Sequence, residues 1–229
     1  LTYKMIDGLK YKDEVLDEFR NITGKDKKSN LNTVSINDYA KDLPFETSSG
    51  KDKVAVIYAN GDIVGGEGSD EQIGSERISR AIRKARLDEN VKAIVIRVNS
   101  GGGSALASDV IWREMVLSKK VKPVIASFGD VAASGGYYIG CAADSIFVQP
   151  NTITGSIGVF GILPNMTELS KKIGISTSQV KTHDHSDEYS PFRPIDEKFK
   201  EVTTESVEHI YITFVQRVAT GRKMTVEQV

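Results

Sequence analysis

The sequence predicts an α/β layered fold in which a mostly parallel sheet is flanked by helices. Four short apolar runs recur along the chain, and segments with a helical spacing of apolar residues lie between them. Each run is apolar at consecutive positions, which is typical of parallel strands buried on both faces. Connections between such strands are right-handed. The runs occupy residues 54–59, 93–98, 124–128 and 145–148.

Helices are predicted between and after these strands. Apolar residues recur at helical spacing over residues 78–85, after the first strand. A second helix is predicted to begin near Ala105, directly after a run of glycines. Near the end of the chain, residues 196–220 carry apolar side chains close to a helical period. They predict a long helix that ends at Gly221.

Residues 1 to 50 differ in composition from the rest of the chain. They are polar, with clusters of Lys, Asn and Ser, and only Lys12–Phe19 shows a short helical pattern. We expect a connecting segment here and a folded domain over residues 51–229. The chain begins with Leu1 and ends within an amphipathic pattern. We therefore expect a C-terminally truncated piece of a longer protein.

The overall composition argues against several classes of function. There are 30 Lys and Arg against 31 Asp and Glu, a net charge of -1. A nucleic-acid partner is therefore not expected. No apolar run approaches the about 18 residues of a membrane span, so the chain is expected to be soluble, with any membrane anchor outside it. The single cysteine, Cys141, excludes an internal disulfide and a cysteine-based zinc site, and it is expected to be buried. No cofactor or metal is expected.

Two glycine-rich elements carry the candidate chemistry. The first, residues 99–104, reads Asn-Ser-Gly-Gly-Gly-Ser and opens a helix. Its free N–H groups and positive helix end suit a negative charge. Nucleotide phosphate is disfavoured because neither the G-x-G-x-x-G spacing nor a P-loop lysine is present. The oxyanion of an acyl-transfer intermediate and a tight turn without a ligand both remain open.

The second element, residues 132–137, places Ser134 between small residues at a strand-to-helix corner. Such a serine has room for a substrate and leaves its backbone N–H free. A nucleophile elbow needs this freedom, although the G-x-S-x-G pattern is absent. The alternative is a helix of small residues that packs against the sheet.

A nucleophilic serine needs a general base, and the chain has three histidines. His183 and His185 fall in a polar sequence that is more typical of a solvated loop than of a metal site. His209 falls on the last predicted helix and is expected to be structural. The sequence therefore assembles no Ser-His-Asp triad. A lysine base stays possible, because a desolvated lysine loses its proton near neutral pH.

Three motifs together resemble the signal peptide peptidase A family, also called protease IV, of the ClpP/crotonase superfamily. They are residues 95–104, 132–138 and 152–161, in the family's order and spacing. The resemblance covers the predicted domain and implies a ClpP/crotonase-like fold. One local departure is Gly101, where the family usually has proline.

The resemblance implies a serine endopeptidase of the Ser-Lys dyad type that degrades cleaved signal peptides. It implies a bacterial enzyme associated with the inner membrane, facing the periplasm. Ser134 falls on the nucleophile. The backbone N–H groups of Gly102 or Gly103 and of Gly135 fall on the oxyanion hole. Ser156 falls on the hydroxyl that contacts the catalytic lysine.

The main departure from the family concerns that lysine. Short members carry it well beyond the nucleophile, but residues 182–191 contain serine and acidic residues instead. Lys181 is the nearest candidate, although it comes too early and at the end of a predicted strand. In the long members, the C-terminal half holds the serine and the N-terminal half holds the lysine. This chain resembles such a C-terminal half.

The partners implied are therefore a peptide substrate with small or apolar side chains, the protein's own N-terminal half, and further copies of the protein. A non-catalytic assembly or scaffold domain of the same fold is the alternative. A crotonase-like enzyme acting on acyl-CoA is disfavoured, since it has no use for a serine in a small-residue corner.

Overall fold

The computed structural model describes residues 10–26, 29–35, 38–39, 50–183, 186 and 189–229. The chain divides into two compact units, residues 1–49 and residues 50–229. The first unit contains helix α1 (Lys12–Ile22), which extends beyond the predicted end at Phe19. No residue of α1 is buried.

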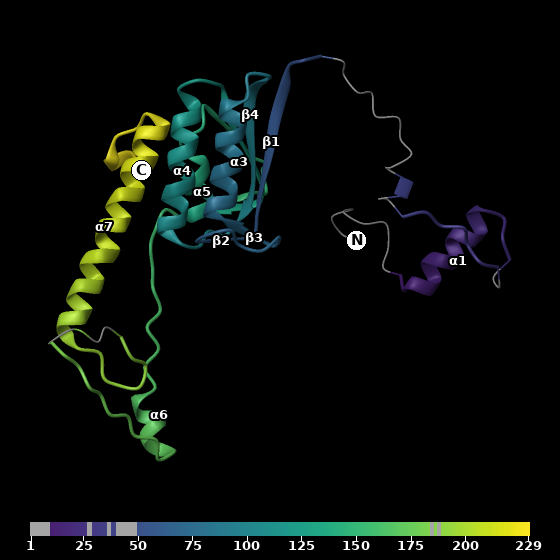
Figure 1. Ribbon diagram of the computed structural model, residues 1–229. Helices are drawn as coiled ribbons and strands as arrows, with labels where there is room; N and C mark the ends of the chain where they lie inside the picture. Colours follow the sequence, from purple (N-terminus) through teal and green to yellow (C-terminus); the bar gives the residue numbers. More distant parts are fainter. Residues whose placement is uncertain (1–9, 27–28, 36–37, 40–49, 184–185, 187–188) are drawn as a thin grey trace. The chain divides into compact units, whose positions relative to one another are not determined.

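A parallel sheet forms the centre of the second unit, in the order β1-β4-β5-β6, with β7 also pairing with β5 (Figure 1). All of its strand pairs are parallel, so the predicted sheet is confirmed. A separate parallel pair, β2 with β3, lies beside it. The strands are β1 (Lys53–Asn60), β2 (Asp62–Val64), β3 (Gln72–Gly74), β4 (Val91–Ser100), β5 (Val124–Ala133), β6 (Ser145–Phe147) and β7 (Ile153–Gly155).

Helices flank the sheet, as the sequence predicts. The core lies between them and the strands, where Ile96 of β4, Ile82 of α3 and Ile111 of α4 are fully buried. On its other face, the edge strand β1 leaves Val56 and Tyr58 half exposed or more, so this strand is not buried on both faces. The helices are α3 (Ser75–Leu87), α4 (Ala105–Lys119), α5 (Gly135–Gly140), α6 (Thr167–Lys172), α7 (Glu197–Arg222) and the short η1 (Val226–Gln228).

The long C-terminal helix is present, but its predicted end at Gly221 is wrong. Helix α7 continues to Arg222, and Lys223 then adopts a left-handed conformation with φ 56°. The reason is packing, because a side chain at Gly221 would run into the carbonyl oxygen of Cys141. Glycine here permits close approach to the end of α5. Cys141 itself is buried, as predicted.

Helix α7 is held against α4 and α5 by a mixed apolar and polar cluster. The guanidinium of Arg217 lies 3.9 Å from the centre of the Trp112 ring, and its Nε donates to Asp109 Oδ1 at 3.3 Å. The hydroxyl of Tyr138 donates to the same oxygen at 2.7 Å. Burial and this bond raise the pKa of Tyr138. Phe214 stacks at a tilt on Tyr138, with ring centres 4.6 Å apart.

Within the described part of the chain, no helix is both long and apolar enough to cross a bilayer.

Candidate active site

Ser134 occupies the corner between β5 and α5. Its backbone has φ 50° and ψ -123°, a conformation that non-glycine residues rarely adopt. Contrary to the sequence prediction, the Ser134 N–H is not free, because it donates to the carbonyl of Gly155 at 2.9 Å and ties the corner to the end of β7. No hydrogen bond joins the Ser134 hydroxyl to any side chain that the structure describes. The corner therefore presents a serine in a strained backbone whose hydroxyl makes no such bond.

The glycine loop lies directly against this corner. Gly102 has φ 107°, and a Cβ there would lie 2.7 Å from the Gly135 nitrogen and 2.9 Å from the Ser134 Cβ. Only glycine allows this approach. At Gly101, in contrast, an added Cβ would meet nothing within 4 Å.

Strand β2 fixes the direction of the loop's amides. The Ile63 N–H donates to the carbonyl of Gly102, and the Ser104 N–H donates to the carbonyl of Ile63, each at 2.8 Å. Gly103 lies between them in a parallel bridge, so its own N–H points away from Ile63. The Gly102 N–H donates to Ser100 Oγ at 3.0 Å. The N–H of Gly102 is therefore already hydrogen-bonded, whereas the N–H of Gly103 is bonded neither to Ser100 nor to Ile63.

The Gly135 amide is the third candidate donor. Gly135 is the first residue of α5, and the first N–H groups of a helix have no acceptor within the helix. A Cβ on Gly135 would lie 3.2 Å from the Cα of Gly102. The glycine loop and the first residue of α5, which carry the candidate amides, therefore lie in close contact.

These residues open into one cleft with a volume of about 550 Å³. Asp62 carries the only charged side chain among its described lining residues. Ser156, which follows β7 and has φ 49°, also lines the cleft. The lining consists of Asp62, Gly101, Gly102, Gly103, Ala105, Ser108, Ser134, Gly135, Tyr138, Ser156, Gly158, Val159, Phe160, Ile210 and Phe214. The structure thus brings together Ser134, the glycine loop and Ser156.

Lys181 does not join this group. It lines a different cavity, together with Tyr189 and Phe199, and lies in irregular chain rather than at the end of the predicted strand. The strand prediction at Lys181 is wrong, because the segment between α6 and α7 pairs with no strand within the described residues.

Histidine is also missing from the described lining of the cleft. His183 is exposed in the loop after Lys181, and His209 is exposed on α7. His185 lies outside the described residues. The general base is thus the one component of the predicted chemistry that the described residues do not place beside Ser134.

Several lining residues carry no local sequence signal. Ile210 and Phe214 come from α7, far along the chain from the two glycine-rich elements. Asp62 follows an Asn-Gly turn that predicts only the end of a strand. Their place in the cleft depends on long-range packing.

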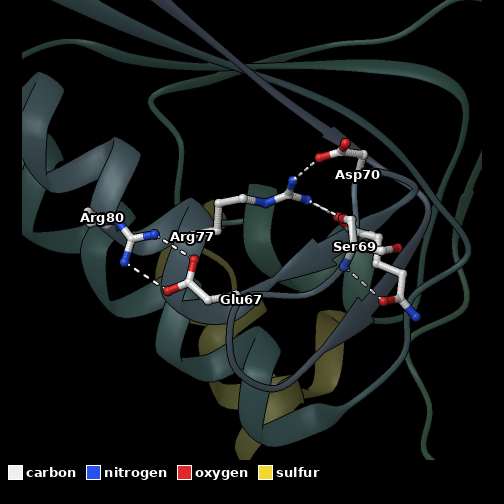
Figure 2. Close-up of polar contacts among 6 residues, drawn as sticks. Glu67, Ser69, Asp70, Arg77 and Arg80 are labelled. Carbon is white, nitrogen blue, oxygen red and sulfur yellow. Dashed lines mark hydrogen bonds and ion pairs between the residues drawn. The ribbon is translucent and has the colours of Figure 1, made fainter.

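The loop between β2 and β3 is fastened to helix α3 by two arginines (Figure 2). Arg77 donates to the carbonyl of Ser69 at 2.7 Å and to Asp70 at 3.3 Å. Arg80 pairs with both carboxylate oxygens of Glu67, at 2.8 and 2.6 Å, and its hydrogen bonds lower the pKa of Glu67. These contacts steady the strand pair that contacts the glycine loop through Ile63.

Known peptidases are similar to this chain in sequence. Residues 117–229 match Peptidase family S49. Protease 4 from Haemophilus influenzae is 41% identical over 209 residues, which cover 90% of this chain and 34% of that protein. The chain belongs to peptidase family S49.

The names of the family and of a plant relative agree with the predicted class of enzyme, a serine peptidase. "Serine protease SPPA, chloroplastic" from Arabidopsis thaliana is 36% identical over 231 residues, which cover 98% of this chain and 34% of that protein. This chain therefore spans about a third of the length of these relatives. A solved structure of a ClpP1 mutant from Listeria monocytogenes is similar, with a TM-score of 0.43 and 18% identity, covering 76% of this chain and 75% of that one.

Proposed function

We propose that this S49 chain supplies the nucleophile, Ser134, of a serine endopeptidase that uses a Ser-Lys dyad. The observation that carries the proposal is the strained corner at Ser134, with the backbone of Gly102 packed against it. Strain of this kind persists where the surrounding structure holds it in place, and it is common at active sites. In this proposal, the backbone N–H groups of Gly103 and Gly135 form the oxyanion hole.

In this mechanism, Ser134 Oγ attacks the carbonyl carbon of the scissile peptide bond. The carbonyl oxygen becomes an oxyanion and accepts hydrogen bonds from the Gly103 and Gly135 amides. The general base takes the Oγ proton and passes it to the leaving amine, and water then hydrolyses the acyl-enzyme. Removal of one oxyanion donor raises such a barrier by about 3 to 4 kcal/mol, so the loop matters as much as the serine.

The general base is proposed to be a lysine from outside these 229 residues. The described lining of the cleft contains neither lysine nor histidine, and Lys181 lines another cavity. Ser156, which lines the cleft, is proposed to orient the incoming amine by a hydrogen bond. Burial by the arriving domain would favour the neutral amine that a base requires.

The proposed substrates are signal peptides already released by cleavage, bound in extended form. The cleft walls of Gly, Ala, Val and Phe favour small or apolar side chains. We place the enzyme at the bacterial inner membrane, facing the periplasm, with its anchor outside this chain. Residues 1–50 would connect to an N-terminal half that carries the lysine, and the protein would assemble as a homo-oligomer.

A fluorophosphonate probe tests the nucleophile, because it reacts only with an activated serine. We expect mass spectrometry of the full-length protein to find the adduct on Ser134, and we expect Ser134→Ala to abolish both labelling and hydrolysis of apolar peptides. Full hydrolytic activity in Ser134→Ala would remove the assignment. Absence of any adduct in a folded protein would favour the alternative, a scaffold domain, which agrees with the lack of a base among the described lining residues.

A further inference from the structure

Asp62 occupies a fixed position at the edge of the cleft. The next residue, Ile63, is hydrogen-bonded to the glycine loop on both sides, through Gly102 and Ser104, which holds this part of β2 in place. Ile63 is 1% exposed and points into the core. Because side chains alternate along a strand, Asp62 points the other way, where it is exposed and lines the cleft.

The carboxylate of Asp62 has no structural task within the described part of the chain. No hydrogen bond or ion pair joins its side chain to a described residue. Two acidic groups in the loop between β2 and β3 are different, since Glu67 and Asp70 are paired with Arg80 and Arg77 (Figure 2). Asp62 therefore places an unpaired negative charge in a cleft that is otherwise uncharged along its described lining.

The walls of this cleft are suited to a long side chain with a cationic end. Val159 and Phe160 line the same cleft, and Phe160 is 85% exposed. Lysine and arginine lay their alkyl stems on apolar surface while the charged end reaches a polar partner. A cation near an aromatic ring gains further stabilisation from the face of the ring.

From this placement we infer that Asp62 forms a subsite for the side chain of a lysine or arginine in the peptide bound beside Ser134. The inference rests on the proposed function, and it names one feature of the substrate. A metal ion is a poor alternative occupant, because the described residues contain no group of three or more metal-binding side chains. The catalytic lysine is also a poor alternative partner for Asp62, since a neighbouring carboxylate would keep its amine protonated.

Binding to the full-length Ser134→Ala protein tests the subsite without requiring catalysis. The probes are fluorescein-labelled apolar peptides that differ at one position, where lysine replaces the uncharged norleucine, and that position is moved along the peptide. For at least one position, we expect the lysine peptide to bind about two- to five-fold more tightly, the range of an exposed ion pair. The preference should shrink at high salt, because the charges are then screened.

Two further substitutions in the same background separate this subsite from a general effect of charge. Asp62→Asn keeps the shape and should abolish the preference for lysine. Glu71→Gln removes an exposed carboxylate that does not line the cleft and should retain the preference. Equal binding of both peptides at every position, no binding, or a preference that survives Asp62→Asn would each overturn the inference.

Labelling of Ser134 in the native protein keeps the two proposals apart. Labelling without an Asp62-dependent preference would leave the peptidase function standing and remove the subsite. An Asp62-dependent preference without labelling would support the peptide subsite and count against the nucleophile.

Discussion

Gly102 and Gly101 are adjacent glycines with opposite requirements. Gly102 has φ 107° and lies so close to the Ser134 corner that a Cβ would lie 2.7 Å from the Gly135 nitrogen. A Cβ on Gly101 would meet nothing within 4 Å. At Gly102, the demand for glycine therefore comes from the approach to Ser134, whereas at Gly103 it comes from the contact with Ile63.

We predict that Gly102→Ala lowers the rate of fluorophosphonate labelling of Ser134 by about 100-fold or more, comparable to loss of an oxyanion donor. The methyl group would push the loop away from the Gly135 amide. Gly101→Ala is the matched control and should label at nearly the native rate. Similar rates for both variants would show that the loop does not act on Ser134.

The burial of Cys141 can be tested by measuring the stability of the protein at alkaline pH. Burial raises the pKa of its thiol from 9.0 to about 12. Below pH 9 the thiol is protonated in both the folded and the unfolded protein, so the full stability is present. Between pH 9 and 12 only the unfolded state loses this proton, so the free energy of unfolding falls as pH rises.

Urea unfolding under reducing conditions at pH 8, 9 and 10 measures this effect. The thiol contributes a fall of at most about 1.4 kcal/mol per pH unit above pH 9. Cys141→Ala should be less stable than the native chain at pH 8 but should show a smaller fall between pH 9 and 10. Parallel curves would mean that the thiol is not protected from ionisation.

Local patterns singled out Ser134 and the glycine loop but left their roles open, and the family resemblance then assigned these roles and added Ser156. The structure brings all of them to one cleft. Asp62 and Phe214 were missed because nothing in their local sequence reports that β2 and α7 line the same cleft. Side-chain chemistry is visible in a sequence, whereas the neighbours of a side chain depend on packing.

At the scale of elements, runs of mostly apolar residues predicted four strands of the sheet, β1, β4, β5 and β6. The expected burial on both faces does not hold for β1, whose outer face is exposed. Strands β2, β3 and β7 were missed because no run of apolar residues marks them, whereas β6, which also has three residues, lies in such a run. The end of α7 was misplaced because Gly221 was interpreted as a helix terminator. Its actual task is to admit the carbonyl of Cys141.

The close packing of Gly221 against Cys141 predicts an unusual response to substitution in α7. Gly→Ala inside a helix usually stabilises by about 0.5 to 1 kcal/mol. We expect Gly221→Ala to destabilise instead, by about 1 to 3 kcal/mol, because the added methyl group would overpack the contact with α5. Thr220→Ala, at the adjacent exposed position, should have little effect.

Urea unfolding at neutral pH checks this pair of variants. A stabilised Gly221→Ala protein would mean that α7 does not pack closely on the end of α5. Because Ile210 and Phe214 of α7 line the cleft, the same variant should also weaken binding of apolar peptides.

At the scale of the whole molecule, the nucleophile and its general base are proposed to come from different domains. The chain spans about a third of long relatives such as Protease 4 from Haemophilus influenzae, and the described lining of its cleft offers no base. The enzyme would then become active only when the two domains are assembled.

Comparison of Ser134 labelling in this 229-residue chain and in the full-length protein tests this claim most directly. We predict an adduct on Ser134 in the full-length protein and little or none in the chain alone, with circular dichroism as the control for folding. Lys181→Ala in the full-length protein should leave labelling unchanged. Rapid labelling of the isolated chain, lost on Lys181→Ala, would contradict the account and make Lys181 the base.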